Sequence, residues 1–227
     1  MRQSIFFAVT MAWLVLSAGC GSSYHARDMK LQSTLVNPAL LQKGTGDQAL
    51  YRYINKKIDI HQYDKILLDP VVITKDGTLD AEARANYQRL ADNAYVFLSR
   101  ELGKDYKLVK TPGPGCMRVQ MGILDADPSQ PVRNVLASLT PIGMAVNLVE
   151  YSTSGKQSGV GEISVELKVS DAATGELMGA MVDRRVGGEH VSSDTWADAD
   201  AGLQWWAKRM RYILCMARSP VGCEKPE

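Results

Sequence analysis

The residues with the clearest chemical signature stand near the amino terminus, where Leu16-Ser17-Ala18-Gly19 directly precedes Cys20. Arg2 and the uncharged, mostly apolar run from Ile5 to Leu16 are the first two parts of a secretory signal. The small residues that follow suit a peptidase groove, and a cysteine immediately after them is typical of a lipobox. The sequence therefore predicts a cleaved signal peptide over residues 1–19 and acylation of the Cys20 thiol, with palmitate as one modification. An ordinary signal peptide followed by a chance cysteine is the alternative.

The apolar run is too short to remain as a transmembrane helix. Its twelve residues would rise about 18 Å, against a hydrocarbon core of roughly 30 Å. The motif resembles that of bacterial lipoproteins, and this resemblance implies three acyl chains on the cysteine, which would anchor the chain firmly. Gly21 stands where an inner-membrane lipoprotein has Asp. We therefore expect a lipid anchor on the periplasmic face of the outer membrane of a Gram-negative bacterium.

No other stretch carries a recognisable catalytic motif. G-x-S-x-G, P-loop, H-E-x-x-H and G-x-G-x-x-G patterns are all absent from the sequence. His61 and His190 stand near Asp59 and Glu189, and the four would bind a metal only if the fold brought them together. We expect exposed loop residues instead, and therefore no enzymatic activity, no metal and no cofactor; a hydrolase with an unrecognised site is the competing hypothesis.

Three cysteines remain after lipidation, namely Cys116, Cys215 and Cys223. A periplasmic location permits disulfides, and an odd number leaves one thiol unpaired or paired between chains. We prefer a Cys215–Cys223 pairing across a short loop; three buried free thiols are the alternative.

The triplet Asp183-Arg184-Arg185 is the best polar constellation. Alternation along a strand puts Asp183 and Arg185 on one face and Arg184 on the other. Pairing with charges on the neighbouring strand is the simpler interpretation. The alternative is a candidate partner contact, in which the arginines bind a partner carboxylate or a lipid phosphate.

Composition limits the classes of partner. The chain has 26 basic and 25 acidic side chains in 227 residues, and signal cleavage would remove only Arg2 from this balance. A surface without net charge argues against nucleic acid binding.

The elements that position these residues belong to one domain. We expect a lipidated N-terminus and flexible tether over 20–50, a periplasmic α/β domain over 51–218 and a tail over 219–227. Leu35-Val36 and Leu40-Leu41 would dock on the domain or contact a partner. Within the domain, apolar periodicity predicts helices over 80–102 and 195–218 and strands over 65–73, 106–110, 118–124, 162–170 and 177–186.

The segment 134–149 has no charged residue. A core-facing helix, broken at Pro141 and Gly143, is the simpler interpretation. The alternative is a surface element for a membrane, a partner or self-association, for which we single out Leu136, Leu139 and Val146 as candidate contacts.

The order of elements predicts an α+β fold. We expect a mixed, largely antiparallel sheet of about five strands, with both helices packed on one face, because most connections are local hairpins.

Several short motifs support a family resemblance: Ile66 to Val72, Pro112-Gly113-Pro114-Gly115, 161–166, 174–176 and 182–185. In their order and spacing the chain resembles a family of bacterial outer-membrane lipoproteins known only as domain-of-unknown-function family 3313, over about residues 50 to 214. The resemblance implies a periplasmic α/β domain without an assigned reaction.

Together these features predict a non-enzymatic interaction or structural protein of the cell envelope. Acyl chains would hold it to the membrane, and we expect it to bind a protein partner in the envelope. The sequence leaves open whether it also forms a homo-oligomer. A binding module for an apolar or lipid-like ligand, using residues 132–151, is the second hypothesis.

Overall fold

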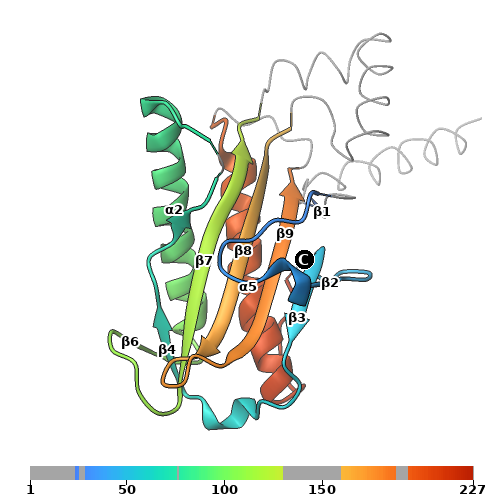
Figure 1. Ribbon diagram of the computed structural model, residues 1–227, viewed down its shortest axis with the longest axis vertical. Helices are drawn as coiled ribbons and strands as arrows, with labels where there is room; N and C mark the ends of the chain where they lie inside the picture. Colours follow the sequence, from blue (N-terminus) through green and yellow to red (C-terminus); the bar gives the residue numbers. More distant parts are fainter. Residues whose placement is uncertain (1–23, 26–28, 76, 130–159, 188–193, 227) are drawn as a thin grey trace, which may run out of the picture.

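Three long strands with alternating apolar residues form the centre of the molecule: β7 (Cys116–Asp127), β8 (Glu162–Asp171) and β9 (Leu177–Val186). The computed structural model describes residues 24–25, 29–75, 77–129, 160–187 and 194–226 (Figure 1). The three strands are antiparallel neighbours, and β8 and β9 are joined by a tight turn in which Gly175 has a φ of 76°. The predicted hairpin is therefore confirmed.

The sheet extends on both sides of these strands in the order β2-β3-β9-β8-β7-β4-β6. On one side, β3 (Tyr51–Ile54) pairs with β9, and β2 (Gln42–Lys43) pairs with β3. On the other, β4 (Lys65–Leu68) runs parallel to β7 and to β6 (Lys107–Val109). Two further short strands complete it: β1 (Tyr24–His25) on β9 and β5 (Val72–Ile73) on β7.

The expected sheet of about five strands, largely antiparallel, is therefore corrected: the described residues form an open mixed sheet of nine strands. The strands outside the predicted ranges, β1, β2 and β3, have two to four residues, which are too few positions to show a clear alternation. The parallel part arises because α2 crosses over between β4 and β7, and such a crossover connects parallel strands. Pro70 falls between β4 and β5, where the strand predicted over 65–73 is interrupted.

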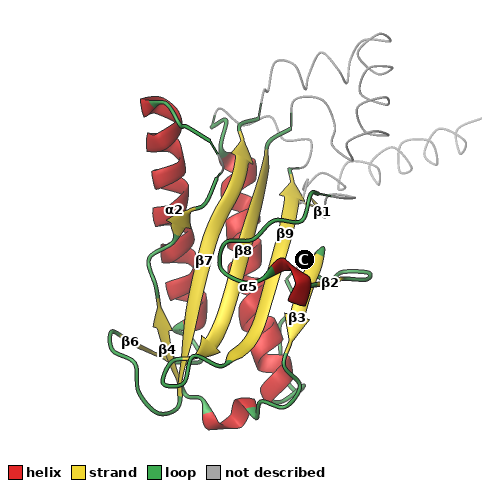
Figure 2. Ribbon diagram, viewed as in Figure 1, coloured by secondary structure: helices red, strands yellow, loops and turns green. Residues whose placement is uncertain are grey.

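Both helices, α2 (Ala81–Leu102) and α5 (Ala197–Arg218), lie side by side on one face of the sheet, as expected (Figure 2). The carboxylate of Asp80 caps α2 by accepting a hydrogen bond from the backbone N–H of Ala83 at 2.7 Å. Gly103 ends this helix in a right-handed conformation, with a φ of −65°, and not in the left-handed conformation expected of a C′ glycine.

The main core lies between the two helices and the sheet. The apolar side of α5 buries Leu203, Trp206 and Met210 against the sheet and α2. Helix α2 contributes Leu90 and Leu98 to the same core. In the described residues, neither helix combines the length and the apolar character that a membrane-spanning segment requires.

The opposite face of the sheet is covered by residues 29–41, which we call the strap. Val36 and Leu41 of the strap join a second apolar cluster with Leu124 and Val182 of the sheet. Because of this cover, β8 is buried on both faces: Ser164 and Glu166, on its polar face, are only 6% and 1% exposed. The patch at 35–41 thus docks on the domain's own sheet, although Leu40 remains exposed.

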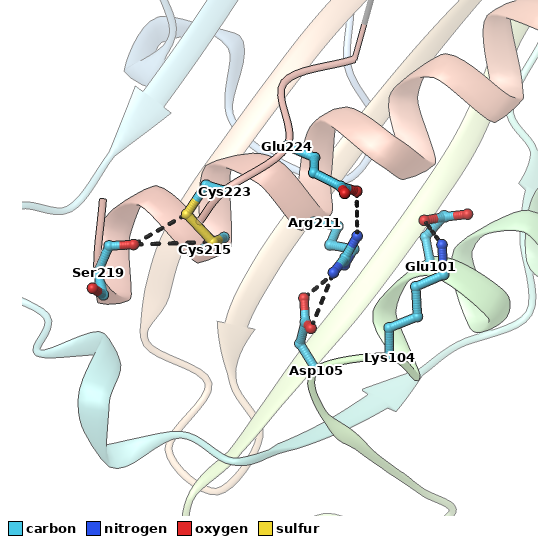
Figure 3. A network of polar contacts seen from close by, with 8 residues as sticks. All are labelled: Glu101, Lys104, Asp105, Arg211, Cys215, Ser219, Cys223 and Glu224. Carbon is cyan, nitrogen blue, oxygen red and sulfur yellow. Dashed lines mark hydrogen bonds and ion pairs between the residues drawn. A yellow bond between two sulfur atoms is a disulfide. The ribbon is translucent and has the colours of Figure 1, made fainter. Parts of the chain in front are cut away.

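The chain after α5 folds back along the helix (Figure 3). Cys215 and Cys223 form a disulfide with a Cα–Cα distance of 5.8 Å. Arg211 lies between Asp105, which follows α2, and Glu224 of the tail, and it forms ion pairs with both, at 2.7 and 3.6 Å. The tail is therefore linked to both helices.

Candidate functional site

A cavity of 480 Å³ opens between the C-terminal half of α5 and the strands β3, β8 and β9. Most of its wall is apolar, with side chains from the helix, from these three strands, from the start of β7 and from the segment after β3. The apolar lining comprises Tyr53, Ile54, Ile58, Ile60, Met117, Leu167, Val169, Met178, Met181, Trp205, Trp206, Met210, Ile213 and Leu214. Ligand sites in proteins typically occupy about 300–1,000 Å³ and have such predominantly apolar walls. This cavity is therefore the candidate binding site.

The periodicities of a strand and a helix explain why these side chains meet. On β9, alternation brings Gly179, Met181 and Asp183 to the face that α5 covers. On α5, Trp206 and Met210 are four residues apart and share one side of the helix. A Cβ atom added at Gly179 would meet only the carbonyl oxygen of Tyr53, at 3.5 Å. The missing side chain at Gly179 therefore helps to leave the cavity open.

The inner end of the cavity contains a buried carboxylate that is well supplied with hydrogen bonds. Asp183 is 0% exposed, and its two oxygens accept hydrogen bonds from the indole N–H of Trp206 at 2.8 Å and from the backbone N–H of Leu50 at 3.1 Å. Arg185, which is 4% exposed, places its guanidinium 3.6 Å from the centre of the Trp205 ring. Burial lowers the pKa of Arg185 to about 10, which the charge of Asp183 partly opposes.

The mouth of the cavity is charged. Asp47 pairs with both Lys225, at 2.7 Å, and Nη2 of Arg209, at 3.3 Å, and the hydrogen bond from Lys225 is the main reason why the pKa of Asp47 is lowered. Nη1 of Arg209 is buried and has no hydrogen-bond partner among the described residues. Arg52 and Lys56 line the same mouth from β3 and from the loop that follows it.

The structure divides the Asp183-Arg184-Arg185 triplet as strand alternation predicts. Asp183 and Arg185 lie on the helix side, while Arg184 forms an ion pair with Glu162 of β8 on the other side of the sheet. All three side chains have contacts within the chain. The other candidate contacts, Leu136, Leu139 and Val146, lie outside the described residues, as does the lipidation site Cys20.

The histidines do not form a metal site in the described structure. His61 contacts the carboxylate of Asp59 through Nδ1 and the carbonyl oxygen of Arg218 through Nε2, both at 2.8 Å, whereas His190 lies outside the described residues. The hydrogen bond with Asp59 raises the pKa of His61. Within the described ranges, His, Cys, Asp and Glu side chains nowhere gather in threes that could hold a metal ion.

Sequence reasoning missed the residues at the mouth of the cavity. The apolar periodicity of 195–218 is typical of a core-facing helix, and Trp206 and Met210 are indeed buried, although they also line the cavity. The available signal was the pair Trp205-Trp206 followed by Arg209, because adjacent tryptophans cannot both lie on one narrow face of a helix. No sequence pattern marked Asp47 or Arg52 as a binding residue, since only the folded chain brings them beside α5.

Distant likenesses to solved structures were found. The PelC dodecamer from Paraburkholderia phytofirmans has 9% identity and a TM-score of 0.36, over 63% of this chain and 83% of that one. A PDZ domain protein from Parabacteroides distasonis has 10% identity and a TM-score of 0.37, over 97% and 41%. A putative neuraminyllactose-binding hemagglutinin homolog from Helicobacter pylori has 11% identity and a TM-score of 0.34, over 77% and 89%. Likenesses this distant say nothing about what the chain binds or how it assembles.

No curated protein matches the sequence. The model of a family described as "Protein of unknown function (DUF3313)" matches residues 31–210. The match begins inside the strap and ends inside α5, so it includes most of the strap and the strands that line the cavity, while Ile213, Leu214 and Ala217 of the lining lie beyond it.

Proposed function

The chain belongs to the DUF3313 family of proteins of unknown function, and on this premise we propose that it is a lipid-anchored, non-enzymatic binding protein of the cell envelope. Its folded domain takes up an apolar ligand in the cavity beside α5. The observation that carries the proposal is a 480 Å³ cavity with a predominantly apolar wall, open at the surface of the domain.

The polar groups of the cavity support binding better than catalysis. Asp183 already accepts two hydrogen bonds from the protein, and Asp47 is shared between Arg209 and Lys225. A general base or nucleophile needs a free acceptor directed at the substrate. These carboxylates instead orient the helix and the mouth around an apolar space.

The lipobox at Cys20 supports an anchor in the outer membrane, on its periplasmic face. Tyr24 pairs with Val186 at the end of β9, and only four positions separate it from Cys20, a reach of at most about 14 Å. The anchor would hold this end of the sheet close to the membrane. Gly179, seven residues before Val186 on β9, lies roughly 23 Å farther along the strand. The cavity would therefore lie toward the end of the domain away from the anchoring membrane.

A direct test uses the full chain with Cys20→Ser, which has no thiol to acylate at position 20 and is purified without detergent. The probe is N-phenyl-1-naphthylamine, a neutral apolar dye that fluoresces in apolar surroundings. We expect saturable binding, and a decrease in affinity of about tenfold or more in Gly179→Leu, because the leucine side chain would occupy apolar space in the cavity.

Gly113→Leu is the matched control, because a Cβ at this loop position meets nothing within 4 Å and Gly113 lies outside the cavity lining. This variant should bind the dye as the parent does. Dye binding that is absent, or that is the same in both glycine variants, would contradict the proposal.

An apolar segment of an envelope protein is a second candidate occupant. Four of the lining residues are methionines, namely Met117, Met178, Met181 and Met210, and flexible methionine side chains adapt to partners of different shape. Crosslinking in intact cells, followed by pull-down of the lipidated protein, should then recover a partner that Gly179→Leu loses and Gly113→Leu retains. Recovery of the same proteins with both variants would exclude the cavity as the contact.

A further inference from the structure

We infer that the ligand of the cavity is a single-chain amphiphile with an anionic head, whose charge Arg52 and Arg209 bind at the mouth. This inference rests on the proposed function and adds a chemical class to it. The apolar wall would take the chain, and the arginines would fix the position of the head.

The first arginine comes from the edge of the sheet. Arg52 pairs in register with Met181 of β9, and both residues line the cavity. Tyr51 and Tyr53, its neighbours on β3, pack against the apolar cluster beneath the strap, so alternation directs Arg52 to the face with α5. Its partly exposed guanidinium forms no hydrogen bond or ion pair with the residues that the structure describes. The charge of Arg52 is therefore available at the mouth.

The second arginine comes from the helix. The side chain of Arg209 is 13% exposed, and its guanidinium carbon lies 5.2 Å from the centre of the Tyr212 ring and 5.8 Å from that of Trp205. Its polar contacts are two long ones through Nη2, at 3.3 Å each, to the carbonyl and the carboxylate of Asp47. Because both contacts are long and Nη1 has no hydrogen-bond partner in the described structure, the Arg209 guanidinium keeps donor capacity for an anionic oxygen.

The charges of the lining do not balance. The lining contains the cationic side chains of Arg52, Lys56 and Arg209 and the carboxylates of Asp47 and Asp183. Asp183 is occupied by Trp206 and Leu50, and Lys225, just outside the lining, competes with Arg209 for Asp47. The mouth therefore has an excess of positive charge, which favours a ligand with an anionic head over a neutral one. Guanidinium groups suit carboxylate or phosphate oxygens because they can donate two parallel hydrogen bonds.

The experiment compares ligands that share a chain and differ in charge. The full chain with Cys20→Ser is loaded with N-phenyl-1-naphthylamine at pH 8, and decanoate, 1-decanol and acetate are used to displace the dye. We expect decanoate to displace it at concentrations about tenfold lower than decanol, because of the added charge-assisted hydrogen bonds. Acetate, which has the anionic head without the chain, should not displace the dye over the same range.

Substitutions of the two arginines test where the anionic head of the ligand binds. Arg52→Gln and Arg209→Gln should each reduce the preference for decanoate, and the double variant should abolish it while decanol still displaces the dye. Arg84→Gln, on the exposed surface of α2, is the matched control and should keep the full preference.

The possible outcomes distinguish the proposed binding of an anionic head from the proposed apolar binding site. Equal displacement by decanoate and decanol in the parent would overturn the anionic head and leave the apolar site in place. A preference that persists in the double variant would overturn the binding of the head by these two arginines, and displacement by acetate at decanoate concentrations would overturn the amphiphile. Failure of the dye itself to bind would overturn the proposed function.

Discussion

The carboxylate of Glu166, in the middle of β8, accepts hydrogen bonds from both the backbone N–H and the hydroxyl of Thr34, at 2.8 and 2.7 Å. Ser33 and Leu35 donate two more, at 2.6 and 3.1 Å, so one buried side chain holds three consecutive residues of the strap. Gly122 of β7 makes room for it, because a Cβ there would lie 2.9 Å from the carboxylate. The strap is therefore fastened at its centre by a single group.

Glu166→Gln should weaken this attachment. The amide keeps one oxygen acceptor but loses the charge that strengthens four hydrogen bonds. We expect the free energy of unfolding in urea to fall by about 1–3 kcal/mol. Glu176→Gln, an exposed change in the turn before β9, should change it by less than about 0.5 kcal/mol. Equal losses in the two variants would show that the strap contributes little.

Acid should release the strap. Burial by itself would raise the pKa of Glu166, but the hydrogen bonds from Ser33, Thr34 and Leu35 hold it below its ordinary value of 4.5. A carboxyl whose pKa is lowered by folding stabilises the fold above its unfolded pKa, and this contribution is lost as the pH falls through the folded pKa.

Amide hydrogen exchange measures this release. Protection factors across residues 29–41 should decrease below about pH 4.5, before those of β7 and β8. Glu166→Gln has no carboxyl to protonate at this position, so an identical acid step in that variant would assign the step to another group.

Trp206→Phe should remove the hydrogen bond that Asp183 accepts from the indole N–H at 2.8 Å. Since both residues are at most 1% exposed, the variant combines a lost hydrogen bond with lost packing. We expect the free energy of unfolding to fall by about 2–4 kcal/mol. Trp205→Phe, at the partly exposed neighbour, keeps an aromatic ring beside Arg185 and should cost less than about 1.5 kcal/mol. A reversed order would contradict the role given to Asp183.

The disulfide should stabilise the end of α5. Removing both sulfurs with Cys215→Ala and Cys223→Ala opens a loop with a sequence separation of eight, which we expect to cost about 2–3 kcal/mol in urea unfolding. Dithiothreitol should destabilise the parent by a similar amount and leave the double variant unchanged. A reductant effect of equal size in both proteins would point away from this disulfide.

The lipid anchor is tested at its cysteine. Cells supplied with labelled palmitate should label the parent protein and leave Cys20→Ser unlabelled, because the thiol is the acceptor that the lipobox predicts. The parent should sediment with outer membranes and Cys20→Ser should not. An unlabelled parent that reaches the same fraction as Cys20→Ser would remove the anchor from the proposal.

Much of the architecture could be predicted from local patterns. Alternation in 162–170 and 177–186 gave the central hairpin, and the helical stripes gave both helices within two residues of their ends. The same rule placed Asp183 and Arg185 on one face of the sheet and Arg184 on the other. Each of these signals lies within one segment, where neighbouring side chains alone set the period.

Local sequence patterns could not predict the strap or the cavity. Polar residues such as Ser164 and Glu166 on one face of a strand are typical of a solvated face, and nothing in the sequence around β8 points to the Ser33-Thr34-Leu35 segment that covers it. In the same way, Asp47 and Arg52 come from one part of the chain and Arg209 from another, and the two parts meet only at the mouth of the cavity.

The sequence by itself determined the two helices and the central hairpin, since these depend on the order of residues within short segments, and it predicts the anchor in the same way. Only the tertiary structure decided what covers each face of the sheet and where an apolar space remains. Contacts such as Glu166 with Thr34 join positions 132 residues apart, and the space beside Gly179 depends on side chains from β3, β8, β9 and α5 at once. Long-range packing carries no local period, so it becomes visible only when the folded chain brings these elements together.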